Sequence, residues 1–155
     1  MGASGLHGWL VIDKPYGVTS ARVVAAIKRS SGAKVGHAGT LDPLATGVLP
    51  LALGEATKTA RFAVGGRKRY RFRIRWGEAR DTDDREGALV GESAARPDAA
   101  AILAALPRLT GTILQRPPAY SAIKLAGRRA YALARAGRMP ELAARPVEIA
   151  ELHLL

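Results

Sequence analysis

The first regular pattern along the chain is a short apolar run over residues 9–12 (WLVI). It ends before a proline and a glycine, which predicts a strand followed by a turn. Residues 21–32 (ARVVAAIKRSSG) then carry apolar side chains at helical spacing, which predicts a helix capped by Thr19 or Ser20 and ended by Gly32. The apolar residues that share one face of this helix are Val23, Val24 and Ile27.

The clearest alternation in the chain lies in residues 69–76 (RYRFRIRW). Every odd position is an arginine, and every even position is aromatic or apolar. A period of two places these two kinds of side chain on opposite faces of a strand. The segment therefore predicts a half-buried strand with one cationic face.

The second half of the chain mixes short patterns of both kinds. Residues 81–87 (DTDDREG) read as an acidic turn, and the stripe after Asp98 predicts a helix with that residue as its N-cap. Residues 113–127 read as extended chain, and 127–137 (GRRAYALARAG) as a short basic helix. Residues 145–155 alternate like a strand up to the last residue, which predicts a fragment of a longer chain. This mixture without regular alternation predicts an α+β fold with a largely antiparallel sheet.

Composition narrows the class of protein. A chain of 155 residues with 48% apolar residues is long enough to form a core. The absence of cysteine excludes disulfides, thiolate zinc sites and cysteine nucleophiles, and three isolated histidines have no metal-ligand spacing. No apolar run is long enough to span a membrane, so we expect a cytoplasmic protein without a metal.

Positive charge suggests a partner. Lysine and arginine number 24 against 13 acidic residues, which gives a net charge of +11 and a pI near 10.9. Such a balance favours a nucleic-acid partner, although an arginine-rich composition can also reflect a GC-rich genome. The crowding of arginine in residues 67–75 adds weight to nucleic acid, because such close like charges repel unless an anion lies over them.

A small-residue loop precedes an apolar, strand-like run that begins at residue 48, and this loop carries Asp42 and His37 (VGHAGTLDPLATGVLP, residues 35–50). Locally, Asp42 reads as an Asp-Pro turn whose carboxylate caps the backbone of residues 44–46. His37 likewise reads as a hydrogen-bonded loop residue. From these residues alone the turn is the favoured interpretation.

Five motifs in order change that interpretation. Taken together, they closely resemble the bacterial tRNA pseudouridine-55 synthases of the TruB type. The resemblance implies a pseudouridine synthase catalytic fold, with a mixed, mainly antiparallel sheet flanked by helices. The motifs are GWLVIDKPYGVTS, GHAGTLDPLATGVLPLALGEATK, KRYRFRIRWGEARDTDDREG, QRPPAYSAIKLAGRRAYALARAG and ARPVEI.

The resemblance also implies a reaction. The T-loop uridine of tRNA would be isomerised to pseudouridine by breaking the C1'–N1 bond and forming C1'–C5, with no cofactor or metal. Asp42 would be the catalytic carboxylate. It could attack the ribose C1', attack C6 of the ring, or assist departure and deprotonate C2', and the sequence leaves these three routes open.

Further residues take roles by the same resemblance. Tyr70 matches a tyrosine that packs against the target base, and His37 matches a histidine that inserts into the T-loop. The expected partner is the T-arm stem-loop of tRNA. The protein is expected to be a monomer and to have no membrane partner. The candidate phosphate contacts are Lys14, Lys68, Arg69, Lys124 and Arg129.

Members of the resembled family continue beyond the matched motifs. The arginine that pairs with the catalytic aspartate, and a tyrosine proposed as general base, lie in that further part. Residues 1–155 are therefore expected to be the N-terminal part of the catalytic domain. A non-catalytic RNA-binding fragment and a guide-RNA-dependent relative are the alternatives.

Overall fold

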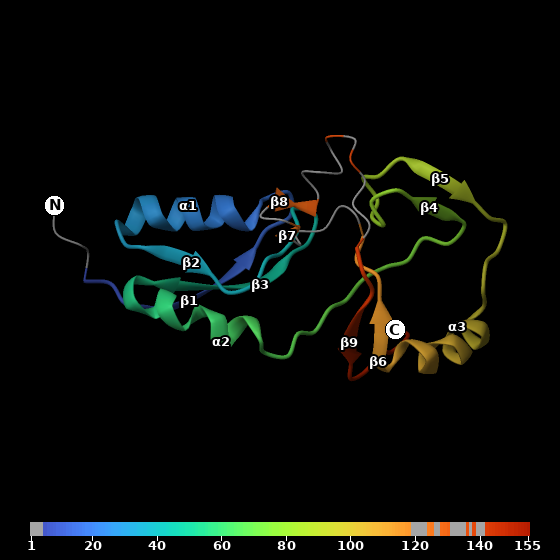
Figure 1. Cartoon of the computed structure of the whole chain (residues 1–155). Coiled ribbons are helices and arrows are strands. Elements are labelled where there is room, and N and C mark those ends of the chain that lie inside the picture. Colours follow the sequence, from blue (N-terminus) through green and yellow to red (C-terminus); the bar gives the residue numbers. More distant parts are fainter. Residues whose placement is uncertain (1–4, 119–123, 126–127, 131–135, 137, 139–141) are drawn as a thin grey trace. The chain divides into compact units, whose positions relative to one another are not determined.

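A computed structural model describes residues 5–118, 124–125, 128–130, 136, 138 and 142–155. The chain divides into two compact units, Met1–Arg71 and Phe72–Leu155, and each is described by itself. Every strand pair among the described residues is antiparallel, and helices accompany the strands, which confirms the predicted α+β class (Figure 1). The strands that the structure describes form four separate sheets of two or three strands.

The first unit is built on a three-stranded sheet in the order β1-β3-β2. Its strands are β1 (Gly8–Lys14), β2 (Val35–His37) and β3 (Gly47–Leu53). β1 and β3 correspond to the predicted apolar runs, whereas the three residues of β2 were predicted as loop. Lys14 pairs with Gly47 at one end of the sheet, and Gly8 pairs with Leu53 at the other. β3 contributes most of the core of this unit, because Leu49, Leu51 and Ala52 are almost completely buried.

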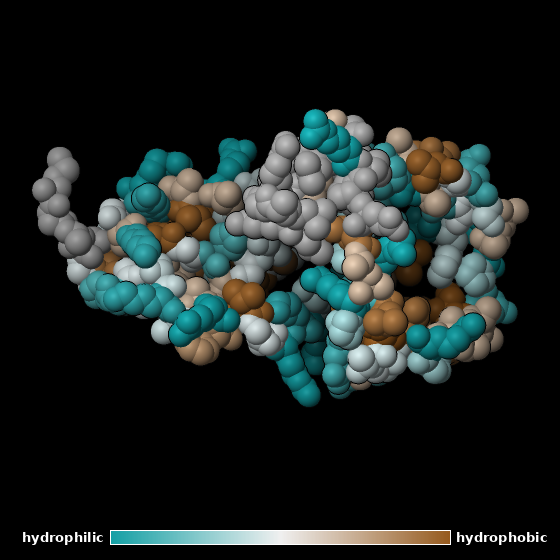
Figure 2. All heavy atoms as spheres, in the orientation of Figure 1, coloured by the Kyte–Doolittle hydropathy of each residue, from teal (hydrophilic) through white to brown (hydrophobic). Residues whose placement is uncertain are grey.

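α1 (Ser20–Ser31) follows β1 and runs along β2 (Figure 1). Its start is capped by Thr19, whose Oγ1 accepts a hydrogen bond of 3.1 Å from the backbone N–H of Arg22. It ends at Gly32, where a φ of 67° lets the backbone N–H donate back to the carbonyl of Lys28. The sequence prediction for this helix is confirmed at both ends. Hydrophilic side chains stand out along its outer edge (Figure 2).

The strand predicted for residues 69–76 is not present. After a short helical stretch, η1 (Gly54–Thr59) and α2 (Ala60–Val64), the chain has no regular secondary structure up to Gly77. Tyr70 is 68% exposed, and both faces of the segment are open. Alternation decides which face a side chain takes, but a strand forms only when a neighbour supplies its hydrogen bonds. None of the described strands pairs with this segment.

The second unit begins with a hairpin around the predicted acidic turn. β4 (Glu78–Arg80) pairs with β5 (Leu89–Glu92), and both strands were missed from the sequence. α3 (Ala99–Ala105) follows, and the carboxylate of Asp98 caps it by accepting a 2.8 Å bond from the N–H of Ala101, as predicted. A 3-10 turn, η2 (Leu106–Leu109), extends this helix.

Two further ladders complete the second unit. β6 (Gly111–Gln115) pairs with β9 (Arg145–Ile149), and β7 (Lys124–Leu125) pairs with β8 (Arg128–Arg129). The prediction that the last strand reaches Leu155 is wrong, because its partner strand begins at the residue opposite Ile149. The basic helix predicted for 127–137 is wrong at Arg128–Arg129, whose backbone pairs with β7 instead. Most of that predicted helix lies outside the described residues.

Glu78 in β4 gives a test of the hairpin by pH. Its carboxylate lies 2.7 Å from Arg80 and 2.8 Å from Arg75, and mainly the hydrogen bonding to Arg80 lowers the pKa of Glu78. Because the pKa of Glu78 is lower in the folded state than its unfolded value near 4.5, the ionised side chain stabilises the fold at pH values above 4.5. This stabilisation is lost as the pH falls through the pKa of the folded state. Glu78→Gln is therefore expected to lower the melting temperature slightly at pH 7, and the difference from the wild type is expected to shrink as the pH falls from 7 to 3. Thermal unfolding followed by circular dichroism checks this, and a difference that is equal at both pH values would contradict it.

Candidate active site

Asp42 lies on the loop that connects β2 to β3, next to the end of the sheet where Lys14 and Gly47 pair. The backbone carbonyl of Asp42 accepts a hydrogen bond of 3.0 Å from the N–H of Ala45, which closes a turn over Pro43 and Leu44. The Asp-Pro turn predicted from the local sequence is thus present. The side chain of Asp42 is exposed.

The carboxylate of Asp42 does not take the capping role that the local sequence predicted. The turn is closed by the backbone carbonyl, and the carboxylate makes no hydrogen bond or ion pair with any described residue. An acid that caps a turn would have its oxygens engaged by N–H groups. As far as the described residues are concerned, both oxygens of Asp42 are therefore available to a bound molecule.

The residue before Asp42 is held by α1. The hydroxyl of Ser20 donates a hydrogen bond of 3.0 Å to the carbonyl of Leu41 and accepts one of 3.0 Å from its N–H. Ser20 is only 3% exposed, so this pairing is shielded from water. The Ser20 hydroxyl thus engages both backbone polar groups of Leu41, its N–H and its carbonyl.

The residue after Asp42 is held by the connection between β1 and α1. The carbonyl of Pro43 accepts a hydrogen bond of 2.8 Å from the N–H of Gly17 and one of 3.4 Å from Nζ of Lys14. The same ammonium donates to the carbonyls of Pro15 at 3.0 Å and Val18 at 2.7 Å. A buried ammonium must be satisfied in this way, because removal from water is costly.

Lys14 corrects one sequence prediction. It was expected to contact an RNA phosphate, but its side chain is completely buried and its three donors all point to backbone carbonyls. Its place is therefore inside the fold, under the loop of Asp42. The backbone is held on both sides of Asp42, and the following proline further restricts the conformation of Asp42 itself.

His37 lies in β2, opposite Leu51, and is half-buried. Its Nδ1 contacts the backbone carbonyl of Gly39. A carbonyl only accepts, so Nδ1 carries the proton in this contact and Nε2 of the neutral ring is left as an acceptor. The ring can thus receive a hydrogen bond from a hydroxyl or amino group of a ligand.

The remaining predicted residues lie on exposed or partly described segments. The ring of Tyr70 and the guanidinium of Arg69 are exposed after α2, while Nζ of Lys68 donates to the carbonyls of Val64 at 2.6 Å and Gly66 at 3.1 Å. Lys124 and Arg129 are opposite each other in the β7–β8 ladder, and their side chains lie outside the description.

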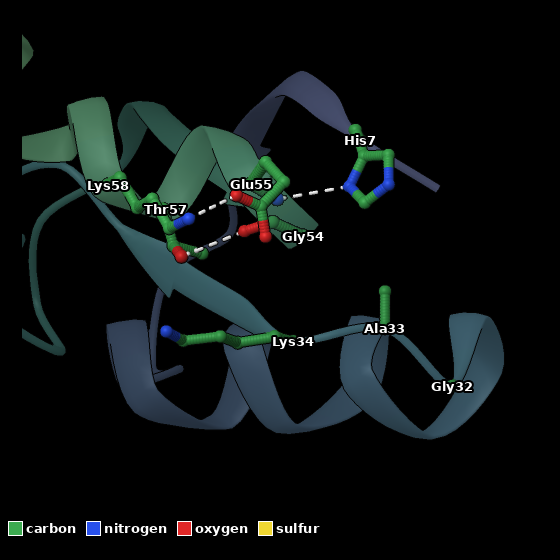
Figure 3. Close-up of a pocket in the computed structure, with 8 residues that line it drawn as sticks. All are labelled: His7, Gly32, Ala33, Lys34, Gly54, Glu55, Thr57 and Lys58. Carbon is green, nitrogen blue, oxygen red and sulfur yellow. Dashed lines mark hydrogen bonds and ion pairs between the residues drawn. The ribbon is translucent and has the colours of Figure 1, made fainter. Parts of the chain in front are cut away.

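A pocket at the other end of the three-stranded sheet is lined by residues from the turn between α1 and β2, from η1 and from the segment before β1 (Figure 3). The seven residues of β1 separate it from the Lys14 end by ~20 Å. Several of its polar groups are engaged with one another: His7 accepts a 3.0 Å bond from the N–H of Glu55, Thr57 donates to Gly54, and Lys58 contacts Glu55. The side chain of Lys34 also lines the pocket and makes no hydrogen bond or ion pair with a described residue.

Among the described residues, no helix is long and apolar enough to cross a membrane. In the same part of the chain, no three histidine, aspartate or glutamate side chains gather as a metal site would require.

A net charge of +11 favours a nucleic-acid partner, and the exposed carboxylate of Asp42 lies on a loop that is anchored at both neighbouring residues. Comparison with known proteins makes the class specific. Residues 26–155 match the model of the TruB family pseudouridylate synthases, N-terminal domain. The chain belongs to this family.

Relatives with curated names agree. The chain is 61% identical over 150 residues to tRNA pseudouridine synthase B of Nitrobacter winogradskyi, covering 96% of this chain and 42% of the relative. It is 62% identical over 151 residues to tRNA pseudouridine synthase B of Bradyrhizobium diazoefficiens, covering 97% of this chain and 44% of the relative. The chain thus spans less than half the length of these relatives.

A solved structure supports the fold. The crystal structure of a Cbf5-Nop10-Gar1 complex includes a chain that is similar to this one, with a TM-score of 0.51 and 31% sequence identity. The match covers 76% of this chain and 31% of that chain. At this identity and TM-score the likeness extends to most of the described architecture.

Sequence reasoning missed the residues that hold the loop. Ser20 was considered only as a helix cap, and Lys14 only as a surface cation. Their contacts reach Leu41 and Pro43, more than twenty positions away. One signal was present: Lys14 stands two positions after the apolar run of residues 9–12 and directly before a proline, which places its backbone close to the core.

Proposed function

We propose that this chain acts in the isomerisation of a tRNA uridine, at position 55 in the T-loop, to pseudouridine, with Asp42 as the catalytic carboxylate. Family membership and the names of the relatives support the reaction. The observation that carries the role of Asp42 is its exposed carboxylate, without a partner among the described residues, on a loop anchored at both neighbours.

The proposed reaction needs one carboxylate of this kind. The C1'–N1 bond breaks, the uracil turns, C1' bonds to C5, and the hydrogen on C5 leaves as a proton. An ionised carboxylate can attack C1', attack C6, or remove the proton from C2' during departure. Each route needs a carboxylate whose direction is fixed before the base arrives, and the anchored loop supplies this.

The other residues have roles in holding the RNA. His37 lies in β2, the strand that leads into the loop of Asp42, and Nε2 of its ring can accept a hydrogen bond when Nδ1 donates to Gly39. The exposed ring of Tyr70 offers a face on which a flipped base can stack. Around it, phosphates would be bound by Lys68, Arg69 and the neighbouring arginines. Lys124 and Arg129 are further phosphate-contact candidates.

We further propose that the chain supplies the N-terminal part of a longer catalytic domain and works in the cytoplasm on tRNA. The length of the relatives supports the first point. The resembled family pairs its catalytic aspartate with an arginine from the further part. A cation there would hold Asp42 ionised inside a closed site, because an opposite charge lowers the pKa of a carboxyl group.

The test is release of tritium from a T-arm stem-loop that carries 5-tritiated uridine. The hydrogen on C5 is lost only when C5 bonds to C1', so release reports the isomerisation directly. The protein produced from the complete gene is expected to release tritium without added metal, and a stem-loop with cytidine at the target position is the control. No release from the uridine substrate would overturn the proposal.

RNA binding without turnover is the second candidate. It is favoured for the 155 residues on their own, because Asp42 has no cationic partner among the described residues. The same assay, run beside an RNA-binding measurement on this chain, separates the two: binding without release supports this candidate. Dependence of release on an added guide RNA would instead indicate a guide-RNA-dependent enzyme.

A further inference from the structure

We propose that Ser20 is a positioning residue of the reaction: through the backbone of Leu41 it sets the direction of the Asp42 carboxylate. The inference rests on the proposed function. It concerns a buried residue of α1 whose hydroxyl is engaged by the backbone of Leu41, and it assigns that residue a part in turnover.

The first observation is the pairing itself. The Ser20 hydroxyl binds both the N–H and the carbonyl of Leu41, each at 3.0 Å, and Ser20 is 3% exposed. Two bonds to one residue restrain its φ and ψ together, as a β-bridge would. Leu41 directly precedes Asp42, so a rotation at Leu41 moves the Asp42 side chain.

The second observation is that the two neighbours of Asp42 have separate anchors. Pro43 is held by Gly17 and Lys14, and these contacts do not involve Ser20. Loss of the Ser20 hydroxyl would therefore release the loop on the Leu41 side while leaving it attached at Pro43. The carboxylate would then sample several directions, and a misplacement of ~1 Å costs ~10²-fold in rate.

The chain contains a matched control at the other end of the same helix. The hydroxyl of Ser31 donates to the carbonyl of Ile27 at 2.7 Å and accepts from the N–H of Ala33 at 3.2 Å. Ser31→Ala therefore also removes one donated and one accepted bond from α1. Its partners are Ile27 in α1 and Ala33 just before β2, and neither is next to Asp42 in the sequence.

The experiment compares Ser20→Ala with Ser31→Ala in the complete gene product by tritium release, RNA binding and thermal unfolding. Both variants are expected to lower the melting temperature. Ser20→Ala alone is expected to lower kcat, by roughly 10- to 100-fold, with KM and the Kd for RNA nearly unchanged. A second comparison uses Ser20→Thr and Ser20→Val, because threonine and valine have nearly the same shape and only threonine keeps the hydroxyl. Both add bulk to the site, so any disturbance of packing is shared. Ser20→Thr is expected to retain more of kcat than Ser20→Val.

Three results would overturn the inference: equal kcat in the two alanine variants, a loss at Ser20 that lies only in KM, or equal kcat in Ser20→Thr and Ser20→Val. These outcomes are distinct from failure of the proposed function, in which the wild-type protein itself releases no tritium.

Discussion

Asp42→Asn is expected to lower tritium release by roughly 10³-fold or more while leaving RNA binding nearly unchanged. Asparagine has the same shape as aspartate, so the anchored turn from Leu41 to Ala45 should remain. What is lost is the charge, because a neutral amide neither attacks carbon nor accepts a proton at neutral pH. Single-turnover release, measured beside the Kd for the stem-loop, checks both halves of this prediction.

Asp83 offers a matched control for Asp42. It also has an exposed carboxylate and lies in the acidic turn between β4 and β5. Its φ of 56° is a conformation that asparagine tolerates well, so Asp83→Asn should fold. Release from this variant is expected to equal that of the wild type. Wild-type release from Asp42→Asn would remove Asp42 from the catalytic role.

Replacing Arg69, Arg71 and Arg73 together by glutamine is expected to weaken RNA binding by roughly 10- to 100-fold in low salt. All three are exposed and have no hydrogen bond or ion pair among the described residues, whereas Arg75 is paired with Glu78 at 2.8 Å. Three free cations release about two to three counterions on binding phosphates, so the slope of log K against log salt should fall by about that amount. Titrations at several salt concentrations measure the slope.

Three exposed cations of α1 provide the comparison: Arg22, Lys28 and Arg29. Their replacement by glutamine removes the same charge from the protein, so it changes the long-range attraction of RNA equally. The slope is expected to change less than for the arginine segment. Equal slopes in the two triple variants would show that net charge, and not the segment after α2, accounts for binding.

The parts of the fold that could be predicted are those with local causes. The helix α1 has a hydroxyl cap at its start and a glycine at its end, and both act within four residues. The capped start of α3 was readable for the same reason. β1 and β3 were readable because each is a continuous apolar run between turns.

The parts that could not be predicted depend on distant partners. Residues 69–76 have the strongest alternation in the chain, yet no described strand pairs with them. Conversely, Arg128–Arg129 were predicted as helix and form a strand because Lys124–Leu125 lie alongside. For the candidate site, the local sequence correctly indicated a turn at Asp42 and wrongly indicated a capping carboxylate. Only the order of motifs along the chain pointed to catalysis.

The burial of Lys14 gives the protein a chemical marker of its own folding. Reagents that acylate lysines need an exposed amino group in its neutral form, and the amino group of Lys14 is enclosed and bound to three carbonyls. In the native protein such reagents should modify the exposed lysines Lys28, Lys34, Lys58 and Lys68 and leave Lys14 intact. Acylation of Lys14 would then record each opening of the loop that carries Asp42.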